Sequence, residues 1–186
     1  PAAAARWLEV TTREVGRPTS ERVLDVLPKR FGKYGLSLHP DKTRMVRFRR
    51  PDRDEDGGGP GAFDFLGFTH HWGRSRKGHW VVKKRTARDR FSRALSNIRN
   101  WCRVHRHDDV KEQHRALARK LNGHYAYYGV TSNYDALARL WNEAVLTWRK
   151  WLSRRSQKAY HSWAKMTRLL ERYPLPPPRI VHRYVS

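Results

Sequence analysis

The sequence predicts an α+β fold, in which one helix and a few short strands precede a bundle of three helices. Two patterns predict it: apolar residues alternate in short runs between residues 43 and 83, and they recur every three or four residues from residue 86 onward. The chain has 186 residues, of which 38% are hydrophobic and 12% are aromatic. A disordered basic tail would lack these aromatic residues, so we expect a packed core.

The first helix is expected over residues 21–34, where apolar residues fall at helical spacing. Gly35 is expected to end this helix with a positive φ, because glycine has no Cβ to clash there. Pro28 predicts a kink or a restart, since proline cannot donate a helical hydrogen bond. Residues 1–20 are left unassigned.

The strands are expected to surround a loop rich in glycine and charge at residues 52–61, which reads as exposed. Residues 43–48 are interpreted as one strand and residues 62–68 as a second, paired with the first across this loop. A third strand is expected over residues 78–83, after a turn.

Three amphipathic helices are expected next, and polar residues mark their starts. Thr86, with Asp89 three residues later, predicts a capping box for the first helix, and Asp109 with Glu112 repeats the pattern for the second. Asn133 is expected to cap the third.

An apolar stripe along each of these helices is expected to form the core, and four tryptophans are assigned to it: Trp101, Trp141, Trp148 and Trp151. A short last helix is expected over residues 160–172. The proline-rich segment 174–178 should be extended.

Charge indicates the class of partner. The 40 Lys and Arg residues against 17 Asp and Glu give a net charge of +23. Residues 1–62 carry 13 basic and 9 acidic residues, a net +4, whereas residues 63–186 carry 27 and 8, a net +19. The 29 arginines favour a nucleic-acid binder, because guanidinium groups pair with phosphate and stack on bases. No run approaches the roughly 18 apolar residues of a membrane helix, so no membrane partner is expected.

Cys102 is the only cysteine, which excludes an internal disulfide and a cysteine-based zinc site. The ten histidines show no metal-binding spacing, so no metal site is expected. The first residues lack the pattern of a signal peptide, and together with the single cysteine this favours a cytoplasmic protein. The chain begins with Pro1, so we expect a fragment, a processed product or a trimmed form.

Four segments resemble, in order, the blocks of bacterial group II intron reverse transcriptases. Residues 27–43 (LPKRFGKYGLSLHPDKT) resemble the end of the polymerase palm, and residues 63–68 (FDFLGF) resemble the primer-grip hairpin. Residues 114–131 (HRALARKLNGHYAYYGVT) are similar to the maturase-specific domain, also called the thumb or X domain. Residues 174–179 (PLPPPR) resemble the usual end of that domain.

The resemblance implies a division into a C-terminal part of the palm, residues 21–84, and a maturase-specific domain, residues 85–186. It also implies that the chain binds group II intron RNA and assists its splicing, as part of a mobile element in the bacterial cytoplasm. The intact family is an RNA-directed DNA polymerase that uses Mg²⁺ and a primer-template of RNA and DNA.

The family's catalytic aromatic-Ala-Asp-Asp motif is absent from the sequence, and residues 1–20 contain no aspartate. Phosphoryl transfer needs that carboxylate pair to hold magnesium. The one Asp-Asp, Asp108-Asp109, is interpreted as a helix cap rather than a metal site. The chain alone is therefore expected to be inactive and to need no cofactor. The family's optional HNH endonuclease is expected to be absent, and a separate palm and fingers polypeptide is a candidate partner.

The resemblance also nominates individual residues. It implies that Lys42 lies near the incoming nucleotide's phosphates in the intact enzyme, as a candidate proton donor to the pyrophosphate leaving group. The primer-grip residues would be Phe65, Leu66, Gly67 and Phe68, with the two phenylalanines structural and the backbone at Gly67 close to the primer strand.

RNA contacts are expected from a basic run interleaved with Trp72 and Trp80, where Asp89 is the one nearby acid. The run comprises Arg74, Arg76, Lys77, Lys83, Lys84, Arg85, Arg88 and Arg90. On the later helix, His124 and Tyr127 are expected to point away from the core toward RNA. The basic run has a plainer interpretation, as a solvated charged face.

The sequence also allows two functions other than binding of intron RNA. In the first, the chain is one part of a split polymerase, whose partner supplies the missing carboxylates. In the second, it is a non-catalytic general binder of RNA and DNA. Primer extension would favour the first, and equal affinity for any polyanion would favour the second.

Overall fold

The computed structural model describes residues 9–11, 17–39, 43–46, 48–51, 61–158 and 160–183. The chain divides into two compact units, Pro1–Lys83 and Lys84–Ser186. The division expected from the sequence falls after residue 84, one residue further along. The described part contains both helices and a small antiparallel sheet, so the predicted α+β class is confirmed.

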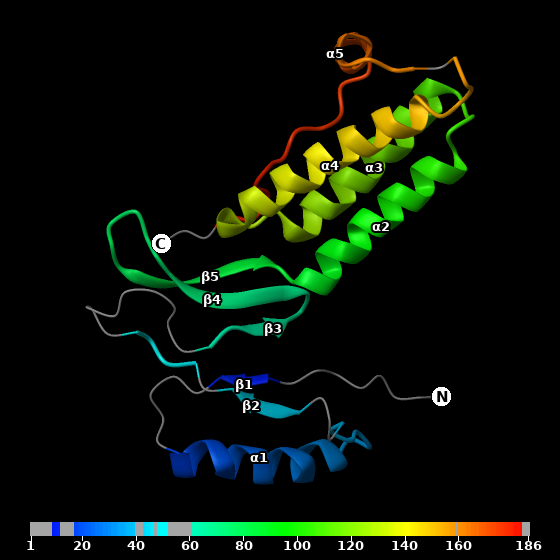
Figure 1. Ribbon diagram of the computed structural model, residues 1–186. Helices are drawn as coiled ribbons and strands as arrows, with labels where there is room; N and C mark the ends of the chain where they lie inside the picture. Colours follow the sequence, from blue (N-terminus) through cyan, green and yellow to red (C-terminus); the bar gives the residue numbers. More distant parts are fainter. Residues whose placement is uncertain are drawn as a thin grey trace. The chain divides into compact units, whose positions relative to one another are not determined.

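The first unit holds one helix and two small sheets, and Figure 1 labels their elements in the order of the sequence. These are β1 (Glu9–Thr11), α1 (Arg17–Gly32), β2 (Arg44–Val46), β3 (Phe63–Phe65), β4 (Phe68–Arg74) and β5 (Trp80–Thr86), whose last residues enter the second unit. The first sheet pairs β1 with β2, and the second has the order β3-β4-β5. The strand predicted after the turn near residue 78 is thus present as β5.

The predicted pairing of residues 43–48 with residues 62–68 is wrong. β2 pairs in parallel with β1, placing Met45 opposite Val10. Residues 62–68 do not form one strand, because the chain reverses at Leu66 and Gly67, whose φ angles are 49° and 78°. A two-residue loop with two positive φ values has the twist that an antiparallel hairpin requires.

Helix α1 is continuous, so the predicted restart at Pro28 does not occur. The predicted ending is confirmed: Gly35 has φ 67°, and the amide of Leu36 donates to the carbonyl of Phe31 at 3.0 Å. The apolar side of this helix is poorly covered, since Val23 and Val26 are 38% and 42% exposed.

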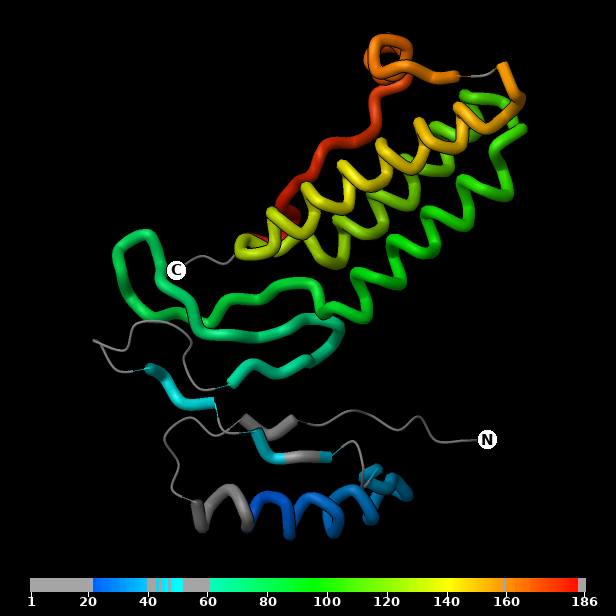
Figure 2. Tube along the Cα trace, in the orientation of Figure 1, coloured from blue at the N-terminus to red at the C-terminus, as the bar shows by residue number. Residues whose placement is uncertain are grey.

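The second unit is the predicted three-helix bundle with a short last helix. Its elements are α2 (Arg88–Val104), α3 (Val110–Tyr128), the 3₁₀ turn η2 (Thr131–Asn133), α4 (Tyr134–Leu152) and α5 (Trp163–Arg172). Helices α2, α3 and α4 lie side by side, and α5 caps one end of the bundle (Figures 1 and 2). From α5 the chain returns along the bundle in an extended conformation, as its proline content predicts.

The core of this unit is contributed by all four helices and the returning segment. Its buried members are Ile98, Cys102, Leu117, Leu121, Tyr125, Leu137, Leu140, Ala144, Val145, Trp148, Leu152, Met166 and Leu175. Trp148 is fully buried and donates its indole N–H to Oε1 of Gln113 at 2.8 Å. Trp101, Trp141 and Trp151 are half-buried at its edge, so the predicted core role is complete for Trp148 alone among these four.

Two of the three predicted helix caps are wrong. The carboxylate of Asp109 accepts from the amide of Lys111 as predicted, but Thr86 caps nothing and the N-cap residue of α2 is Ala87. Asn133 occupies the N-cap position of α4 without a capping hydrogen bond. Its side chain instead accepts from the amide of Thr86 at 2.8 Å and donates to the Thr86 hydroxyl at 2.8 Å. This buried pair therefore fastens η2 to the end of β5.

The returning segment is held along α3 by hydrogen bonds. Nε2 of His114 donates to the carbonyl of Pro174 at 2.9 Å, and the Tyr125 hydroxyl donates to the carbonyl of Pro176 at 3.2 Å. At the end of α3, the carbonyl of Gly129 accepts from the amides of Val181 and His182. A Cβ at Gly129 would clash with backbone atoms, so only glycine allows this close approach.

Candidate nucleic-acid interface

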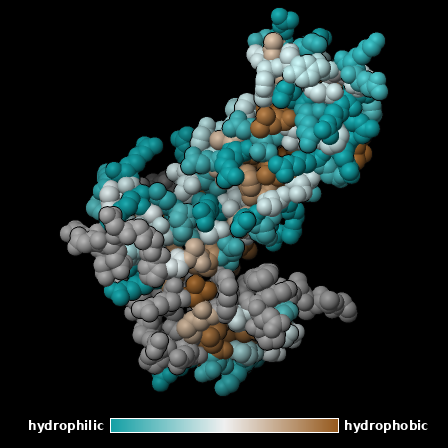
Figure 3. All heavy atoms as spheres, in the orientation of Figure 1, coloured by the Kyte–Doolittle hydropathy of each residue, from teal (hydrophilic) through white to brown (hydrophobic). Residues whose placement is uncertain are grey.

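The second unit carries most of the positive charge. Residues 84–186 contain 23 Lys and Arg but seven Asp and Glu. Four of these acids already have a basic neighbour within ion-pair distance, in the pairs Asp89–Arg90, Glu143–Arg99, Asp108–His105 and Glu112–Arg115. Since each acid balances one cation, most cations of this unit stay uncompensated, and the face in Figure 3 is largely hydrophilic.

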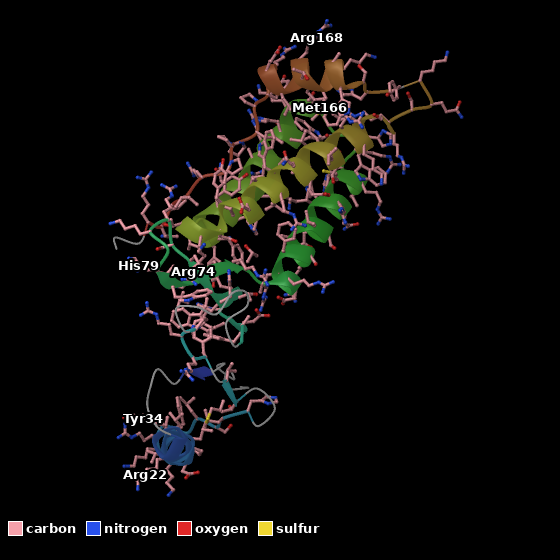
Figure 4. All side chains as sticks on the ribbon, turned by 60° about the vertical axis from the view of Figure 1, so that its left-hand side comes forward. Arg22, Tyr34, Arg74, His79, Met166 and Arg168 are labelled. Atoms are coloured by element: carbon pink, nitrogen blue, oxygen red, sulfur yellow. The ribbon has the colours of Figure 1, made fainter. Side chains whose placement is uncertain are left out.

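The turn between β4 and β5 brings a cation onto one of the aromatic rings that interleave the basic run. The Arg74 guanidinium lies 4.3 Å from the centre of the Trp80 ring, and its Nη1 donates to the carbonyl of Gly78 at 3.0 Å. Gly78 has φ 78°, which the turn requires. Arg76 and Lys77 are exposed in the same turn, and Figure 4 shows Arg74 and His79 at this end of the sheet.

The rest of the predicted basic run does not form a single surface. Side chains alternate along β5, so Lys83 and Arg85 share one face and Lys84 lies on the other. The aliphatic stem of Lys83 passes over Gly73, where a Cβ would come within 2.7 Å of it. Both backbone groups of Lys84 bond to the Ser132 hydroxyl, the amide at 2.8 Å and the carbonyl at 2.7 Å.

Beyond the strand, Arg88 and Arg90 are exposed in the first turn of α2. Arg85, at the end of β5, is exposed as well. These three guanidinium groups therefore belong to a short stretch at the start of the bundle that solvent, and equally a phosphate backbone, can reach.

The four primer-grip candidates form the tip of the β3–β4 hairpin. Phe65 and Phe68 oppose each other across the turn and are half-buried. Leu66 is 64% exposed in a left-handed conformation that costs leucine roughly 1 kcal/mol. Such a strained, exposed apolar residue is typical of a functional position. Lys42 lies outside the described residues.

The two candidates on α3 differ. Tyr127 is 52% exposed and contacts Tyr128 edge-on, with ring centres 4.7 Å apart. His124 is half-buried and stacks on Tyr128 at 4.5 Å, and burial lowers its pKa to about 4. Because the imidazole is therefore neutral at pH 7, His124 cannot serve as a cationic phosphate ligand there.

A second basic surface was missed in the sequence. Residues 149–168 contain seven Lys and Arg and no acid, a signal that was available from the start. In the structure, the Arg149 guanidinium lies 4.2 Å from the centre of the Trp163 ring, and that of Arg154 lies 5.5 Å from Trp151. Trp151 fits the apolar stripe of α4 by its spacing, but it lies half-buried at the edge of the core, where Arg154 reaches its ring.

The acidic residues do not form a metal site in the part of the chain that the structure describes. No group of three or more His, Cys, Asp or Glu side chains there could hold a metal ion. The carboxylate of Asp108 contacts Nδ1 of His105 at 2.7 Å, and Asp109 caps α3. This pair therefore does not fit the two-magnesium centre of a polymerase.

No family model, curated protein or solved structure matches the chain. Among the described residues, no helix has both the length and the apolar composition needed to cross a membrane. The features of the molecule that point to a function are the acid-poor surface of the second unit and the cations that stack on aromatic rings.

Proposed function

We propose that this chain binds structured group II intron RNA and assists its splicing, as the thumb side of an intron-encoded reverse transcriptase in the bacterial cytoplasm. The observation that carries the proposal is the charge of the second unit, which has 23 Lys and Arg residues but only seven Asp and Glu residues. These residues surround a packed core. A rigid core holds cationic groups at fixed spacings, which suits recognition of a folded RNA by shape.

The chemistry of the exposed groups favours nucleic acid over other polyanions. Guanidinium groups lie on the rings of Trp80 and Trp163, so phosphate ligands and stacking surfaces occur together. Phosphate contacts supply affinity, and aromatic rings accept unpaired bases. The restriction to intron RNA rests on the four sequence segments that resemble the reverse transcriptase family.

The proposed role is binding and not polymerisation. The chain's one Asp-Asp pair, Asp108-Asp109, is engaged by His105 and by the backbone of α3 instead of being open to magnesium. A primer-extension assay of the full chain tests this part, and nucleotide incorporation above that of a buffer control would overturn it.

Competition binding tests the main proposal. The full chain is bound to a labelled group II intron RNA at moderate salt, and an unrelated structured RNA of equal length competes. We expect the intron to bind at least about tenfold more tightly, and its affinity to fall steeply with salt. Equal affinities would instead identify a general binder of RNA and DNA.

A further inference from the structure

The end of the bundle formed by α5 gathers several cationic groups around one imidazole. Arg149 comes from the last turn of α4, Arg155 and His161 from the segment that follows, and Lys165 from the first turn of α5. Nη1 of Arg149 donates to the carbonyl of His161 at 3.3 Å, and the amide of His161 donates to Oγ of Ser153 at 3.0 Å. These bonds fix the segment that carries the imidazole.

Three polar atoms in this group lack a partner among the described residues. They are Nε2 of His161, Nε of Arg149 and Nε of Arg155, and all three are buried. A buried donor without an acceptor costs roughly 1 to 3 kcal/mol, more when it is charged. The Nε–H groups of Arg149 and Arg155 are donors that lack an acceptor, and Nε2 of His161 becomes a donor when the ring is protonated, so an anion would supply what the cluster lacks.

The local electrostatics point the same way. Burial and the nearby charges of Lys165, Arg155 and Arg149 lower the pKa of His161. Residues 149–168 contain no acid, and the carboxylate of Asp108, on the neighbouring α2–α3 loop, is already 2.7 Å from His105. Arg155 contacts that loop through the carbonyl of Asp108, so its positive charge is not balanced by the carboxylate.

Aromatic rings flank the cluster. Trp163 is 50% exposed and stacks on Arg149, and Tyr160 is 70% exposed while its carbonyl accepts from Nζ of Lys165 at 3.3 Å. Exposed rings beside a phosphate site provide surfaces on which successive unpaired bases stack.

We propose that Arg149, Arg155, His161 and Lys165 bind a phosphodiester group of unpaired RNA, and that Trp163 and Tyr160 stack on its bases. This inference rests on the proposed RNA-binding function and adds a second contact to it. The site lies at the end of the bundle where α2 finishes, whereas Arg88 lies where α2 begins (Figure 1). The 17 residues of α2 separate the two surfaces by about 25 Å, so one folded RNA can reach both.

The test follows the His161 imidazole by NMR in the full chain, with a His161→Gln variant to identify its signal. The probes are inorganic phosphate and an unstructured uridine octamer. Each should shift the His161 signal and raise its pKa, since a bound anion stabilises the imidazolium. A His161 signal that does not move with the octamer, or that moves with phosphate alone, would overturn the RNA site.

Matched variants locate the contact. Lys165→Gln should weaken octamer binding about three- to tenfold, whereas Arg119→Gln makes the same charge change at an exposed position in the middle of α3 and should weaken it less than about twofold. Trp163→Leu should weaken the octamer about fivefold and leave phosphate binding unchanged. Equal losses for Lys165→Gln and Arg119→Gln would mean diffuse attraction and no site.

The two proposals fail separately. If the octamer shifts His161 but intron RNA binds no better than unrelated RNA, the site stands and the intron assignment falls. If intron RNA is preferred but His161 does not respond to the octamer, the intron assignment stands and the site falls.

Discussion

The two units of the chain differ in how completely they bury their apolar side chains. In the second unit, Leu117, Leu121 and Trp148 are fully buried in a core that four helices share. In the first unit, Val26 of α1 is 42% exposed and Tyr34 beyond it is 81% exposed. The second unit can therefore hold a binding surface rigid by its own packing, whereas α1 gains little stability from burial.

The largest expected effect compares one deletion in each unit. Leu117→Ala should lower the free energy of unfolding by about 3 to 4 kcal/mol, because it opens a cavity in a packed core. Val26→Ala should lower it by less than about 1 kcal/mol, because valine is already half exposed. Urea titrations of both variants check this, and similar losses would break the contrast between the units.

The next effect concerns the polar link inside the second unit. Asn133→Ala should cost about 2 to 3 kcal/mol, because it leaves the buried amide and hydroxyl of Thr86 unsatisfied. The neighbouring Ser132→Ala removes a hydroxyl bound to the exposed Lys84 backbone and should cost less than about 1 kcal/mol. Thermal unfolding of the two variants separates them, and an Asn133→Ala variant as stable as Ser132→Ala would refute the link.

A pH effect should arise from His124. Burial lowers its pKa to about 4, below the ordinary value of 6.5, so the unfolded chain binds this proton more readily. The contribution of neutral His124 to the free energy of unfolding is therefore fully present above about pH 6.5 and is lost as the pH falls toward 4. The loss should be roughly 2 kcal/mol after allowance for the partial exposure of the side chain. In urea titrations at pH 7 and pH 4.5, His124→Phe should show a smaller loss than the parent, and an unchanged loss would contradict this origin.

The smallest effect lies in the first unit, at the β3–β4 turn. Leu66→Asn should raise the free energy of unfolding by about 0.5 to 1 kcal/mol, because asparagine tolerates a positive φ better than leucine. Differential scanning calorimetry measures the shift. A destabilised variant would show that contacts of the Leu66 side chain outweigh its backbone strain.

The helices could be predicted from the sequence because their apolar period is strong and local. The residues that cap the helices were less predictable. Asn133 and Thr86 have the residue types of helix caps, yet they hydrogen-bond to each other across 47 residues of sequence, which no local pattern reveals. The hairpin was misplaced because residues 63–68 alternate as one strand would, and leucine is an unusual residue for a turn with positive φ.

The candidate interface was predictable in composition more than in geometry. The sequence places Arg74 and Trp80 in one short run, but it does not show that one stacks on the other or that strand alternation divides Lys83 and Lys84 between two faces. The cluster around His161 joins α4, α5 and the α2–α3 loop, so its members converge only through the tertiary fold. Its acid-free stretch was nevertheless visible in the sequence.

We propose above that the basic surface of the second unit binds the intron RNA. Removal of three positive charges from either unit, in two matched variants, is the most direct test. One full-length variant carries Arg85→Gln, Arg88→Gln and Arg90→Gln, and the other carries Arg22→Gln, Lys29→Gln and Arg30→Gln on exposed positions of α1. Affinity for a group II intron RNA is measured at one salt concentration. We expect affinity to fall about tenfold or more for the first variant and less than about threefold for the second. Equal losses, or a larger loss for the α1 variant, would contradict the proposal.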